Sequence, residues 1–353
     1  MSTSHIPQIQ AKLGALDALL LTDPITIRYA SGFPIMDGAA VVAKDAAWFI
    51  TDSRYVEAAQ AAIRDMEVLC VSREKPLNAL LQELLAEKAA VGAEENRMTH
   101  AEWQDRQNAL GVEFRPAAGI IAELRASKDA AELEDMIAAQ RIAEKALDEV
   151  LGLLRPGLTE KQVAAELVYR MYKYGGEANS FDPIVVTGAK TSMPHGVPGD
   201  KIIAEGDFVT MDFGTMFGGY CSDMTRTVAV GHATQEMKDI YAIVLEAQLA
   251  GIAAAKPGVP GRDIDGAARK VIEKAGYGAY FGHGFGHSLG LEIHESPNAN
   301  PANDKPMPEG AAISAEPGIY IPGRFGIRIE DVMWLHDGGA QVITKAPKNL
   351  IIL

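Results

Sequence analysis

Residues 207–227, DFVTMDFGTMFGGYCSDMTRT, form the stretch of sequence on which the fold prediction rests. Two runs of apolar and β-branched residues flank a glycine pair, which is typical of a β-hairpin turning around Phe217-Gly218-Gly219. A two-residue loop at Phe217-Gly218 would pair Asp212 with Asp223, and a loop one residue along would place them diagonally. In both registers the two carboxylates lie on one face of the hairpin.

Asp212 and Asp223 would then be like charges side by side, which destabilises a sheet unless a cation lies between them. Two interpretations are open from the sequence. Either the hairpin carries a cation site, or one of the two aspartates faces solvent.

A glycine-rich segment follows the hairpin. Residues 281–297, FGHGFGHSLGLEIHESP, contain three of the eight histidines of the chain, His283, His287 and His294. The glycines disfavour a helix, so this is not the helical His-Glu-x-x-His zinc arrangement. Three histidines in such a loop favour a functional site over isolated structural roles.

Two more segments place carboxylates in apolar surroundings, residues 314–320 (SAEPGIY) and 326–332 (GIRIEDV). An unpaired buried charge is costly, so Glu316 and Glu330 need partners. The second segment is predicted to be a strand with Arg328 and Glu330 on one face. A mutual ion pair at a sheet edge is the alternative to a metal site, but it does not account for Glu316.

Together these segments offer four carboxylates and at least one imidazole. Such an oxygen-rich shell favours Mn²⁺, Co²⁺, Fe²⁺ or Zn²⁺ over a thiolate-bound ion. Bridging carboxylates can hold two ions roughly 3.5–4 Å apart with a shared water between them.

The composition of the whole chain limits the class of protein. Its 353 residues suggest two domains, and a net charge of −14 disfavours nucleic acid and anionic membranes as partners. The two cysteines, Cys70 and Cys221, suggest no disulfide framework and fit a reducing cytoplasm. We expect neither a signal peptide nor a membrane span.

The first part of the chain alternates strand and helix patterns, which indicates an α/β domain. Residues 17–22, 39–43 and 47–50 are expected to be strands, and 53–63 and 75–90 helices. A boundary is expected near residues 123–128. Beyond it, Ser127 is predicted to cap a long amphipathic helix, and Thr159 with Gln162 to form a capping box for the next helix.

Residues 155–181 and 256–281 repeat one order of features: a basic residue, Pro-Gly, a helix, a glycine-rich exit and an aromatic residue. This repeated order either arises by chance, because such residues are common at the starts and ends of helices, or reflects a duplicated α/β half with an active site between the halves.

As a set, the motifs resemble the pita-bread metallopeptidases, which include Xaa-Pro aminopeptidase, prolidase and methionine aminopeptidase. The resemblance covers nearly the whole chain. It implies a creatinase-type N-terminal α/β domain, residues 1–125, and a pita-bread catalytic domain, residues 126–353, with two pseudo-symmetric halves. The matching stretches are 28–33 (RYASGF), 48–54 (WFITDSR), 211–214 (MDFG), 222–226 (SDMTR), 283–287 (HGFGH), 316–320 (EPGIY) and 328–331 (RIED).

The resemblance also implies roles for individual residues. Asp212 would bind one metal ion, Asp223 and Glu330 would bridge two, and His287 and Glu316 would bind the second. Glu316 would also be the general base, and His294 would donate to the scissile carbonyl or its tetrahedral intermediate. The further candidates are His195, a catalytic candidate at the substrate end of the cleft, and the substrate-binding positions His283, Arg328 and Tyr320.

The implied function is a cytoplasmic, homodimeric exopeptidase that removes the residue before proline from short peptides by metal-activated water. It would be an Xaa-Pro aminopeptidase or an Xaa-Pro dipeptidase, and the sequence leaves both open. Two divalent ions are implied, with Mn²⁺ or Co²⁺ favoured over Zn²⁺ or Fe²⁺. The alternatives are a creatinase-like metal-free hydrolase, disfavoured because all five ligands are present, and a non-catalytic prolidase-like peptide-binding protein.

Overall fold

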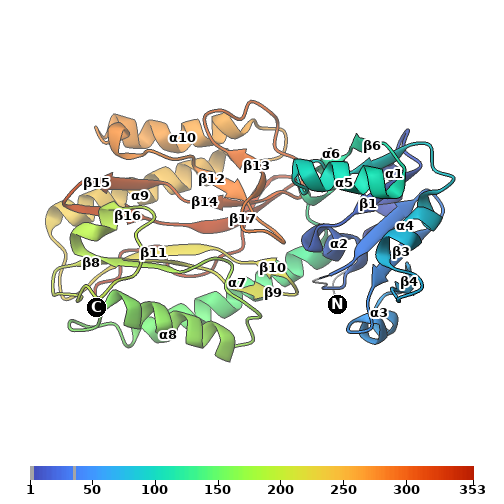
Figure 1. The fold of residues 1–353 in the computed structure, drawn as a ribbon. Helices are drawn as coiled ribbons and strands as arrows, with labels where there is room; N and C mark the ends of the chain where they lie inside the picture. Colours follow the sequence, from blue (N-terminus) through green and yellow to red (C-terminus); the bar gives the residue numbers. More distant parts are fainter. Residues whose placement is uncertain (1–3, 35–36) are drawn as a thin grey trace. The chain divides into compact units, whose positions relative to one another are not determined.

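The computed structural model describes residues 4–34 and 37–353, which fall into two compact units, Met1–Arg125 and Ala126–Leu353. Figure 1 draws the first unit in blue to teal and the second in green to red. Among the described residues, no helix is long and apolar enough to cross a membrane.

The N-terminal unit contains a six-stranded sheet of order β4-β3-β2-β1-β5-β6 (Figure 1). Strand β2 is antiparallel to both of its neighbours, and the other neighbouring pairs are parallel. The alternating pattern in the sequence therefore produced the expected α/β unit. Its elements are α1 (Ile6–Lys12), β1 (Ala18–Leu21), α2 (Pro24–Ser31), β2 (Ala39–Ala43), β3 (Ala47–Thr51), α3 (Val56–Ala62), β4 (Glu67–Cys70), α4 (Leu77–Leu85), β5 (Val91–Ala93), α5 (His100–Leu110), β6 (Phe114–Pro116) and α6 (Ala118–Arg125).

The first half of the C-terminal unit packs two helices against an antiparallel sheet of order β11-β8-β7. A short β9–β10 ribbon extends the hairpin between β8 and β11. The elements are α7 (Ala130–Leu151), α8 (Glu160–Lys173), β7 (Ile184–Thr187), the 3₁₀ turn η1 (Gly188–Ser192), β8 (Phe208–Phe213), β9 (Met216–Phe217), β10 (Tyr220–Cys221) and β11 (Met224–Ala229).

The second half repeats this plan with two helices on a sheet of order β13-β12-β14-β17-β18 and a β15–β16 hairpin. In Figure 1, α9 and α10 lie on one side of the strands, and α7 and α8 lie on the other. Two similar halves therefore form one domain, as the pita-bread resemblance implied. The elements are α9 (Gln235–Ala254), α10 (Gly261–Lys274), η2 (Gly278–Tyr280), β12 (Gly286–Ser288), β13 (Glu295–Ala299), β14 (Ala312–Ala315), β15 (Gly318–Ile321), β16 (Phe325–Arg328), β17 (Asp331–His336) and β18 (Gly339–Val342).

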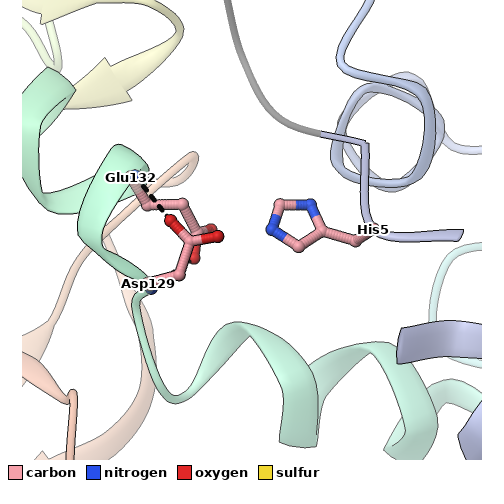
Figure 2. A group of neighbouring side chains, drawn as sticks. All are labelled: His5, Asp129 and Glu132. Carbon is pink, nitrogen blue, oxygen red and sulfur yellow. Dashed lines mark hydrogen bonds between the residues drawn. The ribbon is translucent and has the colours of Figure 1, made fainter. Parts of the chain in front are cut away.

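Helix α7 begins at a capping box made by Asp129, so the prediction of Ser127 as its N-cap is wrong. The Asp129 carboxylate accepts from the Glu132 amide at 2.9 Å, and the Glu132 carboxylate accepts from the Asp129 amide at 2.8 Å (Figure 2). The Ser127 hydroxyl instead donates to the carbonyl of Glu309 at 2.6 Å. The capping box of Thr159 and Gln162 at the start of α8 is confirmed.

The hairpin turns at Gly218-Gly219, one residue later than a loop at Phe217-Gly218. Both glycines have positive φ, 59° and 86°, which a phenylalanine would adopt only with strain. Phe217 consequently pairs with Tyr220 and Asp212 with Thr225.

Thr225 is the strand partner of Asp212, and Asp223 lies two residues before Thr225. The two aspartates are therefore diagonal neighbours, as expected for a loop one residue beyond Phe217-Gly218. Their residues are only 8% and 3% exposed. The alternative in which one of them faces solvent is therefore wrong.

Candidate metal centre and active site

Strand ends and strand-adjacent loops from both halves carry the candidate ligands. Asp212 lies on β8, and Asp223 immediately precedes β11. His287 lies on β12, Glu316 directly follows β14, and Glu330 lies in the two-residue break between β16 and β17. The predicted continuous strand over 326–332 is thus wrong at Ile329 and Glu330, where the chain leaves one hairpin for the main sheet.

Three of these side chains could hold a metal ion together. One ligand atom each of Asp223, His287 and Glu330 lies within 4.8 Å of the others. Glu316 joins the cluster through His287, whose Nε2 is 3.4 Å from Glu316 Oε1 and 3.5 Å from Asp223 Oδ2.

Two of the buried carboxylates in the cluster each have one oxygen without a donor in the described part of the chain. Asp212 Oδ1 and Asp223 Oδ1 are buried without a hydrogen-bond partner among the described residues. Burial, reinforced by repulsion from Asp212, raises the pKa of Asp223 well above its usual range. Burial likewise raises the pKa of Glu316 and, strongly, that of Glu330. Without a cation, these carboxylates are disfavoured in their charged forms.

The tautomer of His287 follows from its surroundings. Its Nδ1 is 3.1 Å from the carbonyl oxygen of Ser288, which can only accept, so Nδ1 carries the proton. Nε2 is then unprotonated and lies beside Asp223 and Glu316 with its lone pair available to a cation, as a metal-binding imidazole requires. Burial lowers the pKa of His287, which favours this neutral form. Ser314 links His287 to Glu316, since its hydroxyl accepts from the His287 amide at 2.9 Å and donates to the Glu316 carboxylate at 3.0 Å.

A buried chain of hydrogen bonds links the carboxylates through Arg328. Its Nη2 donates to Asp212 Oδ2 at 2.6 Å, and its Nε donates to the hydroxyl of Thr225 at 3.0 Å. Thr225 in turn donates to Glu330 Oε2 at 2.6 Å. The ion pair of Arg328 is therefore with Asp212, and the alternative of a mutual Arg328–Glu330 pair at a sheet edge is wrong.

Tyr320 and His283 extend this chain. The Tyr320 hydroxyl accepts from Arg328 Nη1 at 2.9 Å and is 2.9 Å from His283 Nε2. His283 Nδ1 faces the carbonyl of Gly284 at 2.9 Å, so Nδ1 is the protonated nitrogen and Tyr320 donates to Nε2. Burial lowers the pKa of His283, and burial raises the pKa of Tyr320 to about 12. Both groups stay neutral.

A cavity of about 520 Å³ opens over this cluster. Of the ten candidate residues, only Tyr320 is absent from its wall. His294 lies in the wall with its ring centroid 4.5 Å from that of His287, and His195 lies in the wall as an exposed residue.

Sequence reasoning missed several residues of this site. The cavity wall also contains Phe181, Asp182, Ile184, Pro194, Ile293, Asn298 and Asn300. Behind it, Thr225, Arg226 and Ser314 contact the carboxylate-bearing segments, and Arg226 Nη1 donates to the carbonyl of Glu330 at 2.6 Å. Thr225, Arg226 and Ser314 lie within three residues of Asp223 or Glu316 in the chain, which is the signal that could have identified them.

Comparisons with known proteins agree with this architecture. The Xaa-Pro dipeptidase of Pyrococcus furiosus is 34% identical, with 96% of each chain covered. A solved Xaa-Pro dipeptidase from Bacillus anthracis is 40% identical with a TM-score of 0.95, covering 99% of both chains. A solved X-Pro aminopeptidase from Thermotoga maritima MSB8 is 35% identical with a TM-score of 0.93, covering 98% of this chain and 99% of that one.

Two family models also match. Residues 7–127 match the creatinase/prolidase N-terminal domain, and residues 134–337 match metallopeptidase family M24. With its carboxylate–histidine cluster in a pita-bread domain, the chain belongs to metallopeptidase family M24.

Proposed function

We propose that this protein is a dinuclear metal-dependent exopeptidase that removes the N-terminal residue from peptides with proline in second position. The observation that carries the proposal is the cluster of Asp212, Asp223, His287, Glu316 and Glu330 in the wall of one cavity. The metal-free hydrolase and the peptide-binding protein, the two alternatives from sequence, provide no reason to bury four carboxylates together.

The residues present fit divalent cations. Asp212 Oδ1 and Asp223 Oδ1 are buried without donors from residues 4–34 and 37–353, and His287 offers the Nε2 lone pair. Hard oxygen donors with one imidazole suit Mn²⁺, Co²⁺, Zn²⁺ or Fe²⁺. In the proposed arrangement Asp212 would hold one ion, His287 and Glu316 would hold the other, and Asp223 and Glu330 would contribute to both.

Bound divalent ions would supply an acidified water and polarise the scissile carbonyl. Protein residues would transfer the proton and stabilise the charge that develops on the carbonyl oxygen. Glu316 makes its protein hydrogen bond through Oε1, to Ser314, so Oε2 is available to take the proton of the attacking water. His294 lines the cavity beside His287 and would donate to the carbonyl oxygen as negative charge develops there.

Arg328 is given a different task from the direct substrate contact that the resemblance implied. It is 4% exposed and is engaged with Asp212, Thr225 and Tyr320. We assign it to holding Asp212 and, through Thr225, Glu330 in place. Substrate contact is assigned to His195, an exposed residue of the cavity wall, and to the ring of His283 in the same wall, whose two nitrogens are held by Gly284 and Tyr320.

The choice of proline rests on chemistry as well as on relatives. A bond to proline is a tertiary amide without an N–H, so a peptidase that must hold that N–H cannot position it. Attack by an activated water has no such need. Phe181, Ile184 and Ile293 offer apolar cavity wall against which a proline ring can pack. The proteins similar to this chain include Xaa-Pro dipeptidases and an X-Pro aminopeptidase.

A peptide series with defined Mn²⁺ or Co²⁺ tests the proposal. We expect Ala-Pro peptides to be cleaved faster than matched Ala-Ala peptides, and N-acetylation to block cleavage because the free ammonium group no longer meets the carboxylates. Comparing Ala-Pro with Ala-Pro-Ala separates dipeptidase from aminopeptidase action. Equal rates on acetylated and free peptides would exclude an exopeptidase.

A further inference from the structure

A buried ion pair lies next to His294 and has no part in the chemistry proposed so far. Lys128 Nζ is 3.0 Å from Glu295 Oε2, and the two side chains are 1% and 5% exposed. The residues are 167 positions apart in the chain. Because apolar residues can replace a buried ion pair with little loss of stability, stability alone does not require one here.

The Glu295 carboxylate organises the turn that carries His294. Its Oε1 accepts from the Glu292 amide at 3.1 Å, while Oε2 accepts from Lys128. A Cβ on Gly290 would lie 2.8 Å from Glu295 Oε1, so the carboxylate fills the space inside the turn. His294 lies between Glu292 and Glu295, the two residues that this hydrogen bond joins.

The outer ends of the turn are also tied down. The Gly290 carbonyl accepts from the Cys221 amide at 2.7 Å, and Glu295 pairs with Ser288 on the strand that carries His287. The turn is thus attached to the metal-binding hairpin on one side and to His287 on the other.

Lys128 itself is held at the start of the C-terminal unit. Its amide donates to the carbonyl of Gly310 at 2.8 Å, and the neighbouring Ser127 hydroxyl donates to Glu309. With its backbone fixed, Lys128 presents its ammonium group to Glu295 from a defined point.

We infer that Lys128 is a positioning residue for His294 and acts through Glu295 and the turn of residues 290–295. This inference rests on the proposed function, because it assigns His294 a hydrogen bond to the reacting carbonyl. The buried Lys128 ammonium group holds the Glu295 carboxylate, and the carboxylate holds the turn. The turn places the His294 imidazole within reach of the scissile carbonyl oxygen.

The test compares the parent protein with Lys128→Met and with the double variant Lys128→Met/Glu295→Leu, which removes both charges of the pair together. Arg170→Met is the control, since it removes a largely buried arginine that pairs with Glu149 and Glu166 away from the cavity. Each protein is assayed for Ala-Pro hydrolysis, for Mn²⁺ equivalents by calorimetry after chelation, and for amide hydrogen exchange across residues 290–295.

In the Lys128 variants we expect kcat to fall about tenfold to a hundredfold, the cost of a misplaced catalytic group. KM and Mn²⁺ equivalents should stay those of the parent, and exchange in residues 290–295 should become faster. Arg170→Met should change neither kcat nor this exchange. If Lys128→Met does not fold, the double variant alone decides the question.

Unchanged kcat with unchanged exchange in 290–295 would overturn the inference. So would a loss of kcat matched by an equal loss of Mn²⁺ equivalents, since Lys128 would then support the metal centre. If the parent protein cleaved no Xaa-Pro peptide, the proposed function would fail. The exchange comparison would still support or overturn the link from Lys128 to the turn.

Discussion

His287 and His294 are neighbouring imidazoles with different surroundings. His287 donates to the Ser288 carbonyl through Nδ1, and its unprotonated Nε2 lies beside the carboxylates of Asp223 and Glu316, where a cation can meet all three. His294 lies in the cavity wall with its side chain accessible, and partial desolvation by the wall together with nearby His287 lowers its pKa. The first is suited to binding an ion and the second to meeting a substrate.

Replacing His294 by alanine should therefore affect turnover and spare the metal ions. We expect His294→Ala to lower kcat on the order of 10²-fold, as for other lost oxyanion donors. Mn²⁺ equivalents should match the parent protein in a calorimetric titration. His232→Ala is a matched control because His232 is an exposed histidine outside the cavity wall. Loss of one Mn²⁺ equivalent from His294→Ala would mean that His294 is a ligand.

Glu94 makes the stability of the N-terminal unit depend on pH. It is 3% exposed, and burial, reinforced by Asp23, raises its pKa to about 7 despite a 2.7 Å hydrogen bond from Thr26 and the charges of Arg97 and Arg125. In the unfolded chain the Glu94 carboxyl loses its proton near the ordinary pKa of 4.5, whereas in the folded chain it keeps the proton up to a pKa of about 7. Stability should consequently fall as pH rises through this window, by about 3 kcal/mol.

Urea unfolding between pH 4 and 8, followed by a probe in the N-terminal unit, measures this effect. Glu94→Gln keeps an acceptor for Thr26 and should flatten the decline, leaving the variant more stable than the parent above pH 7. A parent and variant with parallel pH profiles would contradict the assignment.

Elements with local sequence signals were predictable. The strands predicted at residues 39–43 and 47–50, the capping box of Thr159 and the non-helical histidine segment all formed, the second strand running one residue further to Thr51. Two details could not be predicted in this way. The register of the hairpin depends on the positive φ that Gly218 and Gly219 adopt in the turn. The N-cap of α7 is not Ser127, because the Ser127 hydroxyl donates to the distant carbonyl of Glu309. Contacts between segments far apart in the chain leave no local pattern in one sequence.

Strand β12 must approach β14 closely for His287 to meet Glu316. A Cβ on Gly286 would lie 1.9 Å from the backbone oxygen of Ser314, so Gly286→Ala forces the strands apart. We expect it to lower the free energy of unfolding by about 1–3 kcal/mol and to weaken Mn²⁺ binding. Gly282→Ala is the control, because no atom of the described part of the chain lies within 4 Å of its added Cβ. Equal urea midpoints and Mn²⁺ affinities for the two variants would refute this argument.

At the scale of the C-terminal unit, each half contributes part of one cluster. Asp212 and Asp223 come from the first half, and His287, Glu316 and Glu330 come from the second. The residue types were predictable from the sequence because buried carboxylates are costly without a cation. Their linkage through Thr225 and Arg328 was not predictable, since it depends on which side chains meet across the join between the halves.

Titration of Mn²⁺ into chelated protein, with bound ion and Ala-Pro hydrolysis followed together, tests the central claim most directly. Hydrolysis should be absent without metal and should rise to a plateau when two equivalents are bound. Glu330→Gln should bind fewer equivalents and stay inactive. Full hydrolysis by the metal-depleted protein, or a plateau at a single equivalent, would contradict a dinuclear metallopeptidase.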